Sequence, residues 1–157
     1  MLLKYKGLPY NVLSTIYPEY DWLPWKFEKC GRHYWDDVKN QRKFMDWAGK
    51  ELKIKEMNDW YNVKTIDLYP LGGAGLLRAK YQSSLSLLLT NVYPENKWLP
   101  WQFNVTSSKF WADNKNKKMF LDWVSEQLNV KEPSDWANVS KKVEKGYKRE
   151  IFNWQRI

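Results

Sequence analysis

The sequence holds very few of the residues that build catalytic, metal-binding or disulfide-linked sites. Its 157 residues include one cysteine, Cys30, and one histidine, His33. A single cysteine excludes an intramolecular disulfide framework. A zinc site needs four ligands, and no second Cys or His pair exists to complete one with Cys30 and His33. A Ser-His-Asp triad would have to use His33. The sequence therefore favours a protein that is not an enzyme and that has no metal and no other cofactor.

Long apolar stretches are also missing. No run approaches the roughly 20 apolar residues of a membrane-spanning helix. The first residues, Met1-Leu2-Leu3-Lys4-Tyr5, lack the apolar stretch and the cleavage site of a secretory signal. We therefore expect an intracellular protein without a membrane partner, and a nuclear location fits the partner suggested below.

What the sequence does hold is a second copy of itself at a spacing of 76 residues. Tyr17-Pro18-Glu19 returns as Tyr93-Pro94-Glu95, and 22 of the 47 positions from Tyr17 to Val63 are identical to their partners. Ten of the eleven tryptophans fall into such pairs. A fixed period of this kind is typical of modular architectures. We predict two homologous modules with Trp-rich cores over 1–70 and 71–139, and a basic C-terminal segment, 140–157, that resembles the degenerate start of a third repeat.

Each module has the pattern of an all-α structure. Ser84, Leu85, Leu88, Leu89 and Val92 follow helical spacing, with Ser83 or Ser84 as the N-cap. In the first copy Pro9 can occupy the first helical position, ahead of Val12, Leu13 and Ile16. No stretch shows the sustained alternation of a strand. The sequence predicts an all-α tandem repeat.

A longer helix is predicted in each copy, from about Trp35 to Leu52 and from Trp111 to Leu128, with a break near Asn40 and Asn116. Its buried stripe would comprise Val38, Met45, Ala48 and Leu52. Asp37 and Asp59 are candidates for helix caps. The glycines Gly72, Gly73 and Gly75 lie at the junction between the copies, where we expect a helix cap or a flexible connection.

Positive charge gives the main indication of a partner. The chain carries a net charge of +8, and residues 140–157 hold six Lys or Arg against two Glu. Basic patches bind phosphate backbones through release of counterions. We therefore expect a nucleic-acid partner, with double-stranded DNA favoured because helices with a basic face fit a groove or follow phosphates. The side chains predicted to contact phosphates are Lys39, Arg42, Lys43, Lys50, Lys117, Lys118, Lys141, Lys145, Lys148 and Arg149.

Four tryptophans lie in two proline-containing loops and are candidates for an exposed aromatic surface. They are Trp22, Trp25, Trp98 and Trp101. Exposed rings of this kind stack on unpaired bases, so their exposure would favour single-stranded DNA or RNA. The alternative function is a protein–protein interaction scaffold, which would hold a partner in an aromatic groove between the modules.

Two resemblances accompany these patterns. The segment Gly73 to Trp98, with its Gly-rich entry, Leu76-Leu77, Tyr81, Ser84-Leu85 and Tyr93-Pro94-Glu95, resembles the small helical repeats appended to homing endonucleases. That resemblance implies an accessory DNA-binding module without catalytic residues. The Gly-Arg-x-Pro entry and the terminal Trp-x-x-Ala-Leu of those repeats are absent here. The tandem units also resemble uncharacterised Trp-rich repeats of fungal and algal proteins, a resemblance that implies no activity.

Overall fold

The computed structural model describes residues 9–28, 30, 31, 33–104, 108–137 and 139. All regular secondary structure among these residues is helical, which confirms the all-α prediction. No helix within these ranges has the length and apolar character that crossing a bilayer requires. The chain divides into two compact units, unit 1 from Met1 to Trp98 and unit 2 from Leu99 to Ile157. The compact units and the sequence period therefore divide the chain at different places, because the period predicts a boundary after residue 70.

The described residues of unit 1 form four α-helices, namely α1 (Pro9–Ile16), α2 (Val38–Glu51), α3 (Ala74–Tyr81) and α4 (Leu85–Val92). Their starts follow from local chemistry. Pro9 is the first residue of α1, where its missing N–H costs no hydrogen bond. At α2, Asp37 is the N-cap and its Oδ1 accepts the Lys39 amide at 2.8 Å. At α4, the Ser84 hydroxyl accepts the Leu87 amide at 3.3 Å. These side chains satisfy backbone N–H groups that have no partner inside the helix.

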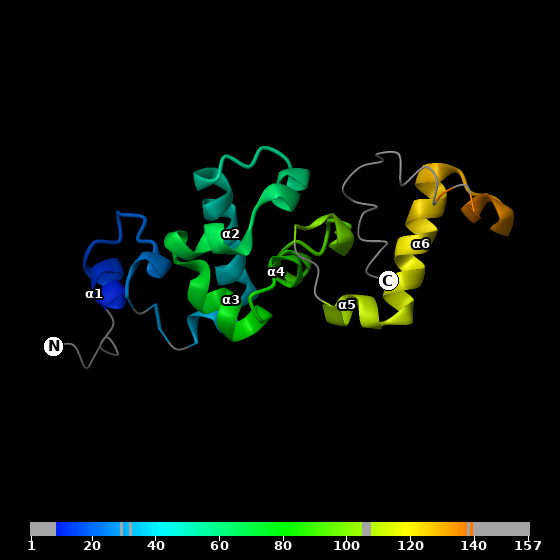
Figure 1. Ribbon diagram of the computed structural model, residues 1–157. Coiled ribbons are helices and arrows are strands. Elements are labelled where there is room, and N and C mark those ends of the chain that lie inside the picture. The colour runs from blue at the N-terminus through cyan, green and yellow to red at the C-terminus, as the bar shows by residue number, and fades with distance from the viewer. Residues whose placement is uncertain (1–8, 29, 32, 105–107, 138, 140–157) are drawn as a thin grey trace. The chain divides into compact units, whose positions relative to one another are not determined.

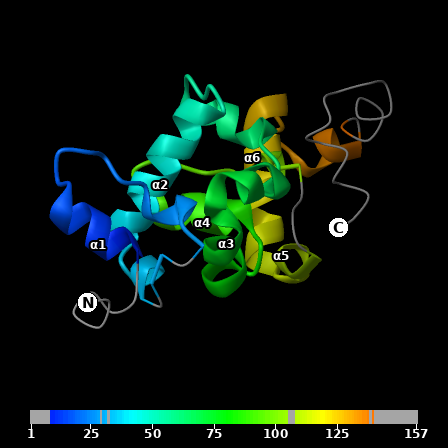
Figure 2. The same cartoon turned by 90° about the vertical axis from the view of Figure 1, so that its left-hand side faces the viewer.

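The core of unit 1 lies where α4 packs against α2 and α3 (Figures 1 and 2). Each helix contributes apolar side chains at helical spacing, and short turns of the chain cover these side chains. The buried side chains from the three helices include Phe44, Met45, Ala48, Leu76, Leu77, Leu85, Leu88, Leu89 and Val92, joined by Trp60 and Leu68. The predicted stripe of the second copy is thus confirmed in α4.

Four side chains join α4 and the Tyr-Pro-Glu that follows it to α2. The Tyr93 hydroxyl donates to Asp46 Oδ1 at 2.6 Å. Arg42 donates to the Val92 carbonyl at 3.2 Å and forms an ion pair with Glu95. Its guanidinium also lies 4.8 Å from the centre of the Tyr93 ring, a distance suited to a cation–π contact. This contact joins the long helix of the first sequence copy to the first part of the second copy.

Unit 2 contains α5 (Ser108–Ala112) and α6 (Asn114–Leu128) among its described residues. Its buried cluster comprises Trp101, Trp111, Phe120, Val124 and Val139. The ring centroids of Trp101 and Phe120 lie 5.4 Å apart in an edge-to-face arrangement, which suits the charge distribution of aromatic rings.

Local structure recurs at the 76-residue spacing. Asp113 caps α6 by accepting the Lys115 amide at 2.8 Å, as Asp37 does for Lys39. Short 3₁₀ turns occur at the paired positions Pro24–Lys26 (η2) and Pro100–Gln102 (η7). At these paired positions the backbone therefore adopts the same local conformation.

The long helices begin later than predicted. Tyr34–Asp36 forms a separate 3₁₀ turn, η3, and the backbone is extended at Asp37 before α2 begins. The break lies at Asp37 rather than near Asn40, because Asn40 belongs to α2 and donates through Nδ2 to the Tyr34 carbonyl at 2.9 Å. Asn116 makes the same bond to the Phe110 carbonyl at 3.0 Å. Val38 of the predicted stripe is 42% exposed, so its assignment to the core is wrong.

Candidate nucleic-acid interface

A pocket of about 430 Å³ lies in unit 1 beside α2. Its volume is within the range of small-molecule sites. Aromatic rings from α1, the Pro24 turn and α2 line it together with lysines, carboxylates and an amide. The lining residues are Tyr10, Asp21, Trp22, Leu23, Pro24, Trp25, Tyr34, Asn40, Lys43, Asp46, Trp47 and Lys50. The fold thus brings together the predicted lysines Lys43 and Lys50 and the predicted loop tryptophans Trp22 and Trp25.

Contacts with α2 hold the aromatic wall of the pocket in place. The Trp25 ring lies 5.5 Å from both Phe44 and Trp47, measured between ring centroids. On the other side, η2 packs against the turn η6 (Tyr69–Gly73). The Trp25 indole N–H is buried and has no hydrogen-bond acceptor among the described residues. A buried donor of this kind destabilises by about 1–3 kcal/mol unless water or a ligand accepts it.

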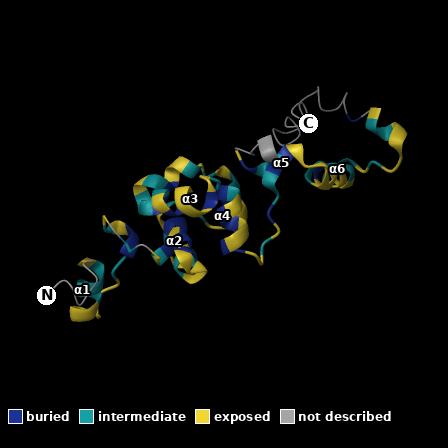
Figure 3. Cartoon of the chain, turned by 90° about the horizontal axis from the view of Figure 1, so that it is seen from below, coloured by how far each residue is buried: buried dark blue, intermediate teal, exposed yellow. Residues whose placement is uncertain are grey.

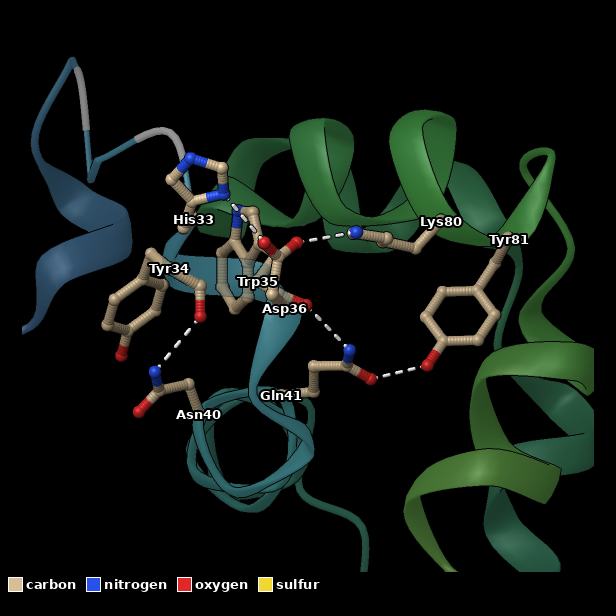
Figure 4. A network of polar contacts seen from close by, with 8 residues as sticks. All are labelled: His33, Tyr34, Trp35, Asp36, Asn40, Gln41, Lys80 and Tyr81. Atoms are coloured by element: carbon tan, nitrogen blue, oxygen red, sulfur yellow. Dashed lines mark hydrogen bonds and ion pairs between the residues drawn. The ribbon is translucent and has the colours of Figure 1, made fainter.

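Polar contacts fix the part of the wall that comes from η3 and α2 (Figure 4). Asn40 Nδ2 donates a hydrogen bond to the Tyr34 carbonyl, and Gln41 Nε2 donates to the Trp35 carbonyl at 2.8 Å. Gln41 is buried and also accepts the Tyr81 hydroxyl. On the exposed side, Asp36 pairs with Lys80 of α3 at 2.5 Å and with His33 Nδ1 at 2.8 Å (Figure 4). Hydrogen bonds from Lys80 and His33 lower the pKa of the Asp36 carboxyl. The η3 turn is therefore attached to both α2 and α3.

The exposed face of α2 carries three of the lysines predicted to contact phosphates. Lys39, Lys43 and Lys50 are exposed and lie at i, i+4 and i+11, which places them on one face of a helix. Asp46 shares this face, and its carboxylate accepts the Tyr93 hydroxyl. Lys26, which the sequence interpretation missed, places its Nζ 4.9 Å from the centre of the Trp47 ring. Basic charge therefore borders the pocket from α2 and from the Pro24 turn.

Arg42 has an internal role that the sequence interpretation did not anticipate. Its guanidinium is engaged by Glu95, the Val92 carbonyl and the Tyr93 ring. The hydrogen bond with Glu95 raises the pKa of Arg42 and lowers the pKa of Glu95. Arg42 therefore joins α2 to α4, and a phosphate would have to compete with these contacts.

The predicted exposed aromatic surface is wrong for three of its four residues. Trp25, Trp98 and Trp101 are 7%, 8% and 2% exposed, whereas Trp22 is half-buried. Trp98 donates its indole N–H to the Tyr93 carbonyl at 3.1 Å and meets the Tyr61 ring edge-to-face at 5.6 Å. Trp101 packs against Phe120 and Trp123. The proline-containing loops fold inward onto neighbouring helices, so most of their rings serve as core.

In unit 2, α6 carries the predicted residues Lys117, which is half-buried, and Lys118, which is exposed. Lys115, at the position equivalent to Lys39, is also exposed. The predicted residues Lys141, Lys145, Lys148 and Arg149 lie outside the described residues. The described part of the site is therefore concentrated on α2.

Among the described residues, no group of three or more His, Cys, Asp or Glu is placed to hold a metal ion. Burial raises the pKa of the Cys30 thiol, which is opposite to the change that activates a cysteine nucleophile.

Tyr10, Asp21, Tyr34, Asn40 and Trp47 also line the pocket and were not predicted as site residues. Their spacing along the chain indicates no shared site, although the paired Asn40 and Asn116 were a signal of a structural role.

Comparisons of this chain with protein-family models, with curated proteins and with solved structures find no match.

Proposed function

We propose that this protein binds nucleic acid without catalysis and that double-stranded DNA is its preferred form. The observation that carries the proposal is the row of exposed lysines on α2, Lys39, Lys43 and Lys50. The row extends over about 16 Å of helix, at about 1.5 Å per residue. One strand of B-DNA presents a phosphate about every 3.4 Å along the axis, so the row can face several phosphates.

Double-stranded DNA is preferred because few of the loop tryptophans are free to stack. An aromatic ladder for unpaired bases needs exposed rings in series, and Trp25, Trp98 and Trp101 are buried. A lysine row on a straight helix needs only a regular phosphate backbone. A single-stranded ligand is the second candidate, and the observation in its favour is the pocket itself. There one base could lie between aromatic walls while Lys43 and Lys50 approach its phosphate.

The salt dependence of binding provides the first test. Three phosphate contacts predict an affinity loss of about fortyfold between about 50 and about 200 mM salt, from a slope of about −0.9 per contact. Fluorescence anisotropy with labelled duplex DNA, single-stranded DNA and RNA would measure this loss and the preferred form. Absence of binding to all three at low salt would refute the proposal. Binding of a protein ligand that is nearly indifferent to salt would instead favour the scaffold alternative.

A pair of matched variants separates a local site from general positive charge. The test variant is Lys43→Gln with Lys50→Gln. The control, Lys55→Gln with Lys97→Gln, removes the same charge at two exposed lysines outside α2. We expect the test variant to weaken duplex binding about tenfold or more at low salt and to flatten the salt slope by about 2. The control should stay within about threefold of the natural protein. Equal losses in both variants would show that net charge, and not the α2 face, drives binding.

A further inference from the structure

The same Tyr-Pro-Glu motif is buried in one copy and exposed in the other. Tyr93 is 2% exposed and Val92 is 1% exposed, while their equivalents Tyr17 and Ile16 are 47% and 49% exposed. Figure 3 shows the same contrast for the helices, since α1 carries no buried residue and the inner face of α4 is buried. Ile16 and Tyr17 therefore form an exposed apolar pair at the positions where Val92 and Tyr93 are covered.

The chain itself contains an example of what covers this surface. In unit 1 the partner is α2, which meets the Tyr93 motif through Arg42 and Asp46. These contacts comprise an ion pair between Arg42 and Glu95 and a hydrogen bond from the Tyr93 hydroxyl to the Asp46 carboxylate.

Equivalents of all four interacting side chains occur at positions that are exposed in this structure. On the α1 side they are Tyr17 and Glu19. On the long helix of the second copy, α6, Lys118 stands in the place of Arg42 and Asp122 in the place of Asp46. Lys118 and Asp122 are both exposed and lie at i and i+4, on one face of α6. Leu121, the equivalent of the buried Met45, lies beside them and is partly buried.

We propose that α1 of one molecule docks onto α6 of a second copy of this chain, with the same contacts that join α4 to α2. Glu19 of one molecule pairs with Lys118 of the other, and the Tyr17 hydroxyl donates to Asp122. Ile16 is buried there as Val92 is in unit 1. The two helices are not identical at these positions, since Lys118 replaces Arg42, Leu121 replaces Met45 and Lys117 replaces the buried Gln41. The charge and the hydroxyl–carboxylate pairing are retained.

The proposed contact joins two different surfaces, so it is heterologous. A heterologous contact generates either closed rings or open chains of molecules, and an open chain has one unoccupied surface at each end. Repeat proteins are extended in the same way, because each structural repeat contacts only the neighbouring repeats. The contact involves one helix end and a few side chains, so weak association is expected.

Sedimentation velocity over protein concentrations from about 5 to about 300 μM tests the proposal. We expect the mean mass to rise with concentration and to continue beyond a dimer, unless rings close. Glu19→Lys or Lys118→Glu alone should weaken association about tenfold or more, because each change places like charges opposite one another. The double variant carrying both changes should recover most of the association, and so should an equimolar mixture of the two single variants.

The apolar part of the contact is tested at Tyr17, and Tyr20 provides the control. Tyr17→Ala should weaken association by about thirtyfold or more, the loss expected for a central tyrosine in an interface. Tyr20 is three residues away and is 63% exposed, and its equivalent in the second copy is Asn96. The Tyr20 ring meets the Tyr17 ring edge-to-face at 6.5 Å, so Tyr20→Ala should weaken association less than Tyr17→Ala does, by no more than about threefold. Circular dichroism spectra of all variants should match the natural protein, which would exclude unfolding as the cause of a loss.

Three outcomes would overturn the proposal. The first is a monomer throughout the concentration range. The second is association that Tyr17→Ala and Tyr20→Ala weaken equally. The third is association that the single charge reversals weaken but that neither the double variant nor the mixture recovers.

Discussion

Replacement of Gly72 by alanine should destabilise unit 1 more than an exposed surface substitution does. Gly72 interrupts the η6 turn with φ +99°, in the left-handed region that side chains disfavour by about 1–2 kcal/mol. A Cβ atom there would lie 2.4 Å from the Trp25 carbonyl oxygen and 3.3 Å from the Trp25 Cβ. The obstructing oxygen belongs to the backbone, so it cannot rotate away as a flexible side chain would.

The expected magnitude combines two effects. Backbone strain contributes about 1–2 kcal/mol. Displacement of η2 from η6 contributes about 1–3 kcal/mol, as insertion of a carbon into a packed site does. Gly72→Ala should therefore lower the free energy of unfolding by about 2–5 kcal/mol. At about 3 °C per kcal/mol for a chain of this size, Tm should fall by about 6–15 °C.

Gly75→Ala provides a control for this prediction. Gly75 lies in the first turn of α3, and the nearest atom to an added Cβ is Trp35 Nε1 at 3.8 Å, an ordinary contact. Alanine is favoured over glycine inside a helix by up to about 1 kcal/mol, so this variant should be as stable as the natural protein or slightly more stable. Thermal and urea denaturation followed by circular dichroism would measure both variants. A Tm for Gly72→Ala within about 1 °C of the natural protein would refute the reasoning, because it would mean that η2 does not lie against Gly72.

Two further predictions concern polar groups in unit 1. Tyr81→Phe removes a hydroxyl that donates to Gln41 and accepts a hydrogen bond from Asn91 Nδ2 at 2.6 Å. Because Gln41 is 3% exposed, urea denaturation should show a free energy of unfolding lower by about 1–3 kcal/mol. A loss equal to that of the exposed control Tyr20→Phe would contradict this prediction. The pKa of Glu95 is lowered by its hydrogen bond with Arg42, so its stabilisation is present above the ordinary glutamate pKa and is lost as pH falls through the lowered value. Glu95→Gln should therefore show a smaller loss of Tm on acidification below about pH 4.5, and acid sensitivity identical to that of the natural protein would exclude this ion pair as a contributor.

Much of the helical structure could be predicted because it depends on near neighbours in the chain. Ser84 and Asp37 cap their helices through bonds to amides two or three residues away, and such bonds follow from local sequence. The apolar stripe of α4 could be predicted in full because its members are three or four residues apart in the chain. Val38 shows the limit of this reasoning. It follows the periodicity of α2, but α2 has 14 residues and α4 has 8. Periodicity identifies a helix face and not how much of its length a partner covers.

The candidate site could be predicted only in part. Lys39, Lys43 and Lys50 follow from helical spacing, and the structure leaves them exposed. The burial of Trp25 could not be predicted, because a loop has no fixed period and its exposure depends on Phe44, Trp47 and Gly72. The internal role of Arg42 was missed for a similar reason, since Glu95 lies in the other sequence copy.

Tyr17 and Tyr93 mark the division between what the chain encodes locally and what its packing adds. Each follows a helix and precedes a Pro-Glu pair, and each carbonyl accepts an indole N–H five residues later, from Trp22 and Trp98 respectively. The composition and the repeat can be read from the sequence directly, and the two indole bonds depend only on residues five positions apart. The exposure of the two rings, 47% and 2%, cannot be read in this way. It depends on whether a helix some 50 residues away in the chain packs against the motif, and α2 does so for Tyr93 through Asp46 and Arg42.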